Sequence, residues 1–243
     1  MSITRKKYIF RLIVRIAILL ACLVTCFTKP EAFDILNGMN FFRTLSPLHL
    51  LWLIWMINMF QQIIPIRNKL PLGSMKLFAN RFKPIRDRIN HEALRDYIIT
   101  TTKYAYQIFA IWVVGILVIY GLYRFGVVGK IFVFMISVAF NVCDLICVLI
   151  WCPFRLMMHN RCCTTCRIFN WDHLMMFSHL IIIGGFYSLS LVCAAFIAWL
   201  AWEVCIMMYP ERFWDKSNAA LKCSACTDKL CTQYCRKIRP HTL

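Results

Sequence analysis

Five long stretches of apolar residues, separated by polar and basic segments, dominate the chain. An α-helix needs about 20 apolar residues to cross a bilayer. This blockwise pattern predicts an all-α fold, a polytopic integral membrane helical bundle, rather than a soluble domain around one core. The runs cover residues 8–27, 48–66, 105–122, 131–151 and 174–208.

The last apolar run, residues 174–208, is about 35 residues long, which is more than one span needs and less than two spans with a turn. Basic segments flank it on both sides, and cytoplasmic loops carry an excess of Lys and Arg. We therefore expect it to enter as a short half-helix, break at Gly184-Gly185 and return as a full helix from about Phe186. One long helix with the tail outside is the alternative. The chain would then have about five full spans plus a re-entrant or broken helix.

The first apolar run has a basic start, as a signal peptide has. However, Arg11 and Arg15 interrupt it, and no small-x-small cleavage site follows. We expect an uncleaved signal anchor with a cytoplasmic amino terminus. Residues 1–209 would form the transmembrane helical domain, and residues 210–243 a short cysteine-rich cytoplasmic tail.

Residues 67–103 form the most basic inner loop. Within it, a short interfacial helix that begins near Ser74 and ends at Pro84 would lie on the lipid head groups. Asn90 can then cap a helix with Glu92 in its first turn, and this helix would continue into the third span. The basic residues expected to face lipid are Lys76, Arg81 and Lys83.

The net charge is +17, from 28 Lys and Arg against 11 Asp and Glu. These basic residues cluster between the apolar runs, which is typical of cytoplasmic loops and of attraction to anionic lipid. No nucleic-acid-binding module is recognisable, so we expect no nucleic-acid partner. We predict an integral protein of the cell (plasma) membrane whose partners are the bilayer, its anionic head groups and a redox or protein partner at the cytoplasmic face.

Half of the 14 cysteines lie in the inner loop and the tail. Two residues between cysteines let both sulfurs reach one metal ion, and the reducing cytosol disfavours disulfides. We predict a cytosol-facing metal site that holds zinc or an iron–sulfur cluster, with palmitoylated or free thiols as the alternative. The candidate ligands are Cys162, Cys163, Cys166, Cys223, Cys226, Cys231 and Cys235.

Several charged residues interrupt the apolar runs and are costly in a membrane unless they are paired. Arg15 and Asp144 lie at similar expected depths, so we predict an ion pair between them. Glu203, nearer the inner face, would pair with Arg11. We expect His179 to be an interior hydrogen-bonding residue. These charges have two interpretations, a proton or ion path and a set of structural pairs.

The segment Cys163-Thr-Thr-Cys166-Arg167-Ile168-Phe169 is similar to the opening of the cysteine-rich domain of DHHC-type palmitoyltransferases. The Asp-His-His-Cys signature of that family is missing, and the most similar stretch of this sequence is Asp172-His173-Leu174. The resemblance therefore implies no acyl-transfer activity here.

Three functions are compatible with the sequence. The first is a membrane protein with a cytosolic cysteine metal site that serves redox sensing or electron transfer. The second is a small transporter or channel component that uses Asp144, with a purely structural zinc. The third is a membrane scaffold that docks lipid or a partner through its basic loop.

Overall fold

The computed structural model describes residues 3–64, 82–85, 89–160 and 166–222, together with Ser224 and Leu230. Within these residues the fold is all-helical, and the one β-type contact is an isolated bridge between Pro84 and Asn218. The long helices are α1 (Ile3–Thr28), α2 (Leu48–Ile63), α3 (His91–Arg124), α4 (Lys130–Leu149) and α7 (Gly185–Met208). The short helical elements are η1 (Pro30–Leu36), η2 (Asn40–Phe42), α5 (Phe154–Met157), η6 (Ile168–Asn170), α6 (Asp172–Phe177), η7 (Ser178–Ile182), η8 (Pro210–Phe213) and η9 (Ala219–Leu221).

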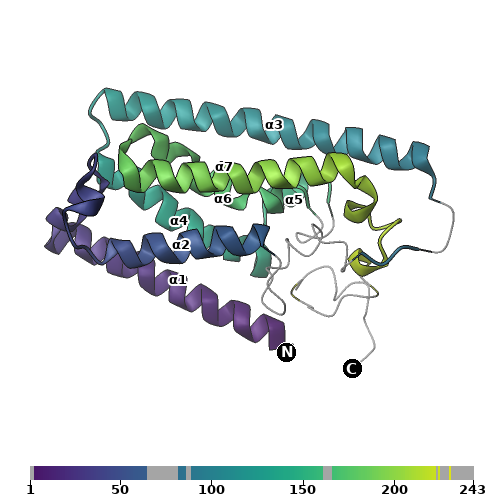
Figure 1. Cartoon of the computed structure of the whole chain (residues 1–243), viewed down its shortest axis with the longest axis horizontal. Coiled ribbons are helices and arrows are strands. Elements are labelled where there is room, and N and C mark those ends of the chain that lie inside the picture. The colour runs from purple at the N-terminus through teal and green to yellow at the C-terminus, as the bar shows by residue number, and fades with distance from the viewer. Residues whose placement is uncertain are drawn as a thin grey trace.

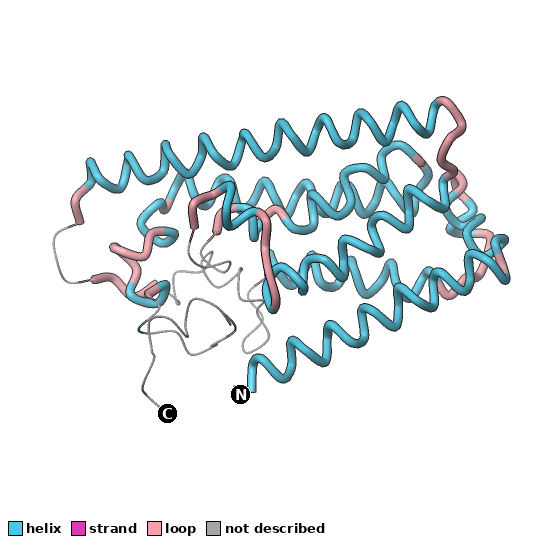
Figure 2. Tube along the Cα trace, turned by 180° about the vertical axis from the view of Figure 1, so that it is seen from behind, coloured by secondary structure: helices cyan, strands magenta, loops and turns pink. Residues whose placement is uncertain are grey.

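The long helices lie roughly parallel to one axis and form an elongated bundle (Figure 1). Helix α1 packs along α4, and α2 packs along α7. Helices α1 and α3 form opposite edges of the bundle, and the view from behind shows the same order (Figure 2). The start of α1 and the end of α7 lie at the same end of the bundle, which we call the terminal end; the other is the far end.

Four of the described helices, α1, α3, α4 and α7, are long and apolar enough to cross a membrane. The edge helices expose many apolar side chains, such as Phe10 and Val24 on α1 and Leu117 and Val118 on α3. Exposing apolar side chains to lipid, unlike exposing them to water, has no free-energy cost. The chain is therefore consistent with the expected helical membrane protein. Helix α2 has only 16 described residues, so the count of five full spans stays a prediction.

The break in the last apolar run occurs where the sequence predicts it. Helix α6 and the 3-10 turn η7 lead toward the far end, and α7 returns from Gly185 (Figure 1). Gly184 and Gly185 have φ values of +68° and +77°, a region that suits glycine. Beyond them, the Phe186 amide donates to the Gly38 carbonyl at 2.9 Å, which fixes α7 against the η1–η2 segment.

The core of the bundle is built from large aromatic and aliphatic side chains on α2, α4, α6, η7 and α7. Trp55 contacts Phe134 and Phe177 with ring centroids 6.0 and 5.0 Å apart. Phe134 also packs edge-on against Tyr187 at 5.8 Å. Because these rings are buried between helices, they fix how α2, α4, α6 and α7 lie relative to one another.

Helix α3 begins as the sequence predicts. Asn90 is its cap, and the Asn90 side chain accepts a hydrogen bond from the Ala93 amide at 3.1 Å. Glu92 lies in the first turn, where a negative charge stabilises the positive end of the helix dipole.

The prediction of an interfacial helix was wrong at Lys83. Lys83 is exposed and not helical; its carbonyl accepts from the Ala219 amide at 2.8 Å, and its amide donates to Asn218 Oδ1 at 3.2 Å. Since Pro84 follows, the helical conformation is disfavoured at Lys83, and the segment after α7 takes its backbone hydrogen bonds instead. Lys76 and Arg81 lie outside the described residues.

Candidate functional site

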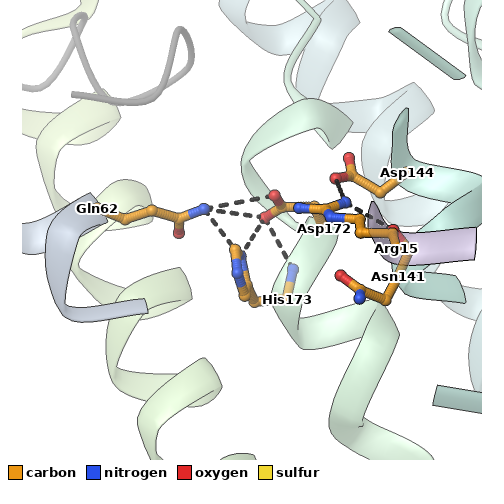
Figure 3. A network of polar contacts seen from close by, with 6 residues as sticks. All are labelled: Arg15, Gln62, Asn141, Asp144, Asp172 and His173. Atoms are coloured by element: carbon orange, nitrogen blue, oxygen red, sulfur yellow. Dashed lines mark hydrogen bonds and ion pairs between the residues drawn. The ribbon is translucent and has the colours of Figure 1, made fainter. Parts of the chain in front are cut away.

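Polar side chains from four elements meet inside the bundle, toward the terminal end (Figure 3). They are Arg15 on α1, Gln62 on α2, Asp144 on α4, and Asp172 and His173 at the start of α6. We call these five residues the polar site. Charged groups among apolar helices need partners or water, and such groups mark functional positions by default.

Arg15 and Asp144 form the ion pair that the sequence predicts. Arg15 Nη1 lies 2.7 Å from Asp144 Oδ2 and also donates to the Asn141 carbonyl at 2.6 Å. The packing of α1 along α4 brings the two charges to the same depth. The carbonyl contact adds a second acceptor, so the guanidinium spans one turn of α4.

Asp172 and His173, at the start of α6, form a second charged pair. His173 Nδ1 lies 2.9 Å from Asp172 Oδ1, and Asp172 Oδ1 also accepts the His173 backbone amide at 2.7 Å. Gln62 Nε2 lies 2.8 Å from the same Nδ1 and 3.4 Å from each oxygen of Asp172. Nδ1 thus sits between one acceptor, the carboxylate, and one donor, the amide.

The two carboxylates of the polar site are neutralised differently. Asp144 has a permanent cation, because arginine stays charged at all physiological pH values. Within the described part of the chain, Asp172 forms no ion pair with lysine or arginine, and its ionic partner is His173. Asp172 therefore takes part in a direct ion pair when His173 holds a proton.

A small cavity of about 60 Å³ lies against the polar site. Gln62, Asn170 and Trp202 border it, and their atoms Gln62 Oε1, Asn170 Oδ1 and Trp202 Nε1 are buried and have no hydrogen-bond partner in the described structure. A buried polar atom without a partner is costly, and one water needs only about 10–15 Å³ of such space. The cavity can therefore admit water or a small polar group that these atoms would hold. Arg11 also borders it, with its guanidinium 5.5 Å from the centre of the Tyr8 ring.

The predicted pair between Glu203 and Arg11 was wrong. Glu203 instead forms an ion pair with Arg167, and its Oε1 accepts from Trp171 Nε1 at 2.9 Å. Arg167 also donates to the Thr102 hydroxyl. Arg167, just before η6, lies against Glu203 on α7, whereas α1 packs along α4.

His179 is an interior hydrogen-bonding residue, as predicted. It is fully buried, and its Nε2 lies 3.0 Å from the Ser137 hydroxyl. It marks a second polar position between α4 and η7, on the side of the polar site that faces the far end.

Of the predicted cysteine ligands, only Cys166 belongs to the described residues. It is buried, and it packs in a cluster with Ala105, Ile108 and Trp171. Among the described residues no group of three or more His, Cys, Asp and Glu side chains could hold a metal ion. The remaining ligands lie outside those residues, so the zinc or iron–sulfur site stays a prediction: Cys162, Cys163, Cys223, Cys226, Cys231 and Cys235.

Sequence reasoning missed Gln62, Asp172 and His173 as members of the site. A signal existed, since Gln62 interrupts the end of an apolar run and Asp172-His173 stands directly before another. Comparison of the chain with protein-family models, with curated proteins and with solved structures found no match. The function must therefore be inferred from the geometry of the site.

Proposed function

We propose that the protein is a small proton-coupled membrane transporter or channel component whose proton-binding group is the pair Asp172–His173. The observation that carries this proposal is the position of His173 Nδ1, 2.9 Å from a carboxylate oxygen and 2.8 Å from the Gln62 amide nitrogen. Buried acid and histidine groups in membrane helices are the usual elements of proton relays.

This arrangement can stabilise both protonation states of His173. With a proton on Nδ1, the ring donates to Asp172 and balances its charge. Without that proton, Nδ1 becomes an acceptor and the Gln62 amide donates to it. Nδ1 of His173 thus keeps a hydrogen-bond partner whether or not it carries the proton, which lowers the cost of binding and releasing a proton at this buried position.

Further polar residues on α4 support a route for the proton. Ser137, Asn141 and Asp144 are spaced i, i+4 and i+7, so they share one face of the helix. Ser137 and Asn141 are buried, and Ser137 contacts His179. At 1.5 Å per residue this polar face extends the site by about 10 Å toward the far end.

Proton flux into liposomes tests the proposal. The purified full-length chain is reconstituted around a trapped pH-sensitive dye, and a potassium diffusion potential drives protons inward. We expect His173→Gln and Asp144→Asn to slow acidification at least about tenfold, because a positioned proton-transfer group contributes that much or more. His91→Gln and Asp96→Asn change exposed residues of α3 and should match the unaltered protein.

A second pair of variants covers the case in which His173→Gln fails to fold. Gln62→Leu removes the donor that stabilises unprotonated His173, while Gln61→Leu alters the neighbouring, less buried glutamine. Slower flux in Gln62→Leu alone supports the proposal. Equal flux in the two glutamine variants, or flux no faster than in protein-free liposomes, would refute it.

A further inference from the structure

Two cysteines meet where α4 ends, outside the polar site. Cys147 lies in the last turn of α4, and Cys152 lies shortly beyond the end of that helix. A side-chain hydrogen bond joins the two thiols, and both cysteines are reduced in this structure. The proton site proposed above uses neither of them, so this pair needs an explanation of its own.

The end of α4 explains why the two thiols meet. On an uninterrupted helix, positions five residues apart lie about 140° apart around the axis, so their side chains point in different directions. Here the Ile146 carbonyl accepts from the Ile150 amide at 2.8 Å and from the next amide at 3.1 Å, so the chain turns tightly as the helix ends. Pro153 disfavours a helical conformation at Cys152. The turn thus brings Cys152 back to Cys147.

Cys147 is the more accessible of the two cysteines. It is half-buried, whereas Cys152 is 8% exposed. Both line an apolar cavity of about 390 Å³ between α3, α4, α5 and α6. Trp151 also lines this cavity and is 53% exposed, so the cavity lies close to the surface of the bundle. A small oxidant can therefore reach Cys147 before it reaches Cys152.

A metal ion is the other common reason for cysteines to gather. Cys143 and Cys166 line the same cavity. However, no group of three or more His, Cys, Asp and Glu side chains in the described part of the chain could hold a metal ion. Two thiols in hydrogen-bond contact, by contrast, need only a short movement to reach the S–S bond length of about 2.05 Å. The contact between Cys147 and Cys152 therefore favours a disulfide.

We infer that Cys147 and Cys152 form a reversible redox modification site whose oxidant is a peroxide. Hydrogen peroxide transfers one oxygen atom to the Cys147 thiol, which gives a sulfenic acid and water. The Cys152 thiol then attacks the sulfenic sulfur, so that the S–S bond forms and a second water leaves. A thiol such as glutathione reverses the reaction by exchange and is itself oxidised to its disulfide. The bond would tie the last turn of α4 to the segment that leads into α5.

Peptide mapping of the detergent-purified full-length protein tests this site. After peroxide treatment, thiols are blocked with N-ethylmaleimide in denaturant, and trypsin releases residues 131–155 as one peptide with three cysteines. We expect this peptide to lack two hydrogens and to carry one maleimide, on Cys143. Dithiothreitol before blocking should give three maleimides. A bond between Cys143 and Cys147, or three maleimides after peroxide, would overturn the inference.

Two variants locate the bond within this peptide. Cys143→Ala leaves Cys147 and Cys152 as its cysteines, so the peptide should keep the disulfide and carry no maleimide. Cys152→Ala should lose the disulfide. Circular dichroism compares the fold of each variant with that of the unaltered protein. Loss of the disulfide in Cys143→Ala, or its survival in Cys152→Ala, would contradict the assignment.

Cys22 and Cys26 are a matched control in the same chain. They lie on the uninterrupted helix α1, and one is buried and the other half-buried, as are Cys152 and Cys147. We expect both to remain thiols and to carry maleimide after the same peroxide treatment. Equal oxidation of the two pairs would mean that the turn after α4 confers no selectivity, and the redox site would be refuted.

Copper phenanthroline, which catalyses the oxidation of neighbouring thiols by oxygen, separates contact from reactivity. A disulfide that forms in Cys143→Ala with the copper reagent and also with peroxide supports the site. A disulfide that forms with the copper reagent alone would confirm the contact but refute modification by peroxide. No disulfide with either reagent would refute both.

Discussion

Glu203 and Asp144 are both carboxylates on apolar helices, and each is paired with an arginine from a different kind of segment. Asp144 pairs with Arg15 on a neighbouring long helix, and their side chains are 17% and 20% exposed, respectively. Glu203 pairs with Arg167 from a connecting segment, and each of these side chains is 8% exposed. Since burial removes the screening by water, the Glu203 pair should be the more sensitive to the loss of one partner.

We expect Glu203→Leu to lower the free energy of unfolding by about 3 kcal/mol, because Arg167 would remain buried without its carboxylate. The double variant Arg167→Leu/Glu203→Leu should lose less than this single change, since no buried charge is left behind. Unfolding by SDS in mixed micelles, followed by circular dichroism, measures both. Glu31→Leu, at an exposed position of η1, is the control. A double variant less stable than Glu203→Leu would contradict the prediction.

Contacts within the site were predictable from the sequence only where both residues lie on long apolar helices. Arg15 and Asp144 interrupt apolar runs, and the rise per residue places them at one depth. Arg167 could not be paired from sequence, because its position depends on how Trp171 and Ile168 pack under α3. For the same reason the meeting of Gln62 with His173, which are 111 residues apart, has no local signal.

At the scale of elements, the break between η7 and α7 is the feature that the local sequence predicts best. Packing against the η1–η2 segment then fixes where α7 lies. Gly184-Gly185 allows positive φ, so the chain can reverse there. The hydrogen bond between Phe186 on α7 and Gly38 was not predictable, because it depends on where the η1–η2 segment lies against α7. The start of α3 was predictable, since Asn90 is a local cap.

We expect Gly185→Ala to destabilise the protein by about 2 kcal/mol or more, through positive φ and a steric clash. A Cβ at this position would lie 2.7 Å from the Leu36 carbonyl oxygen and 2.9 Å from the Gly38 amide nitrogen, and both are backbone atoms. Gly115→Ala is the matched control, because nothing lies within 4 Å of its Cβ and alanine favours the helix interior. Thermal unfolding in detergent compares the two, and equal melting temperatures would count against the proposed packing of α7 on η1–η2.

At the scale of the whole molecule, α4 and α7 both end at the terminal end of the bundle (Figure 1). Leu230 in the tail packs in a cluster with Tyr8, Leu145 and Leu149, which adds contact between the tail and this end. The shared cysteine site stays a prediction, because all its predicted ligands except Cys166 lie outside the described residues.

The distribution of charge between the two ends predicts the orientation in the membrane. Described basic residues at the far end are Lys29, Arg43, Arg124 and Lys130, whereas the terminal end has Arg5, Lys6, Lys7, Lys83, Arg155, Arg167, Arg212, Lys216 and Lys222. Because short cytoplasmic loops carry the excess of Lys and Arg, the terminal end should face the cytosol. The ion pair of Arg15 with Asp144 then lies nearer the cytosolic side.

Epitope tags in intact and permeabilised cells test this orientation. One tag precedes residue 3, a second follows Lys222, and a third is inserted in the turn at residues 126–128, where Gly126 has φ +72° and nothing lies within 4 Å of its Cβ. We expect antibody to reach only the third tag in intact cells and all three after permeabilisation. Labelling of the first and third tags from the same side would mean that α1, α2 and α3 do not cross the membrane an odd number of times. In that case at least one of these three helices would not span the bilayer, and the orientation that the charge distribution predicts would be wrong.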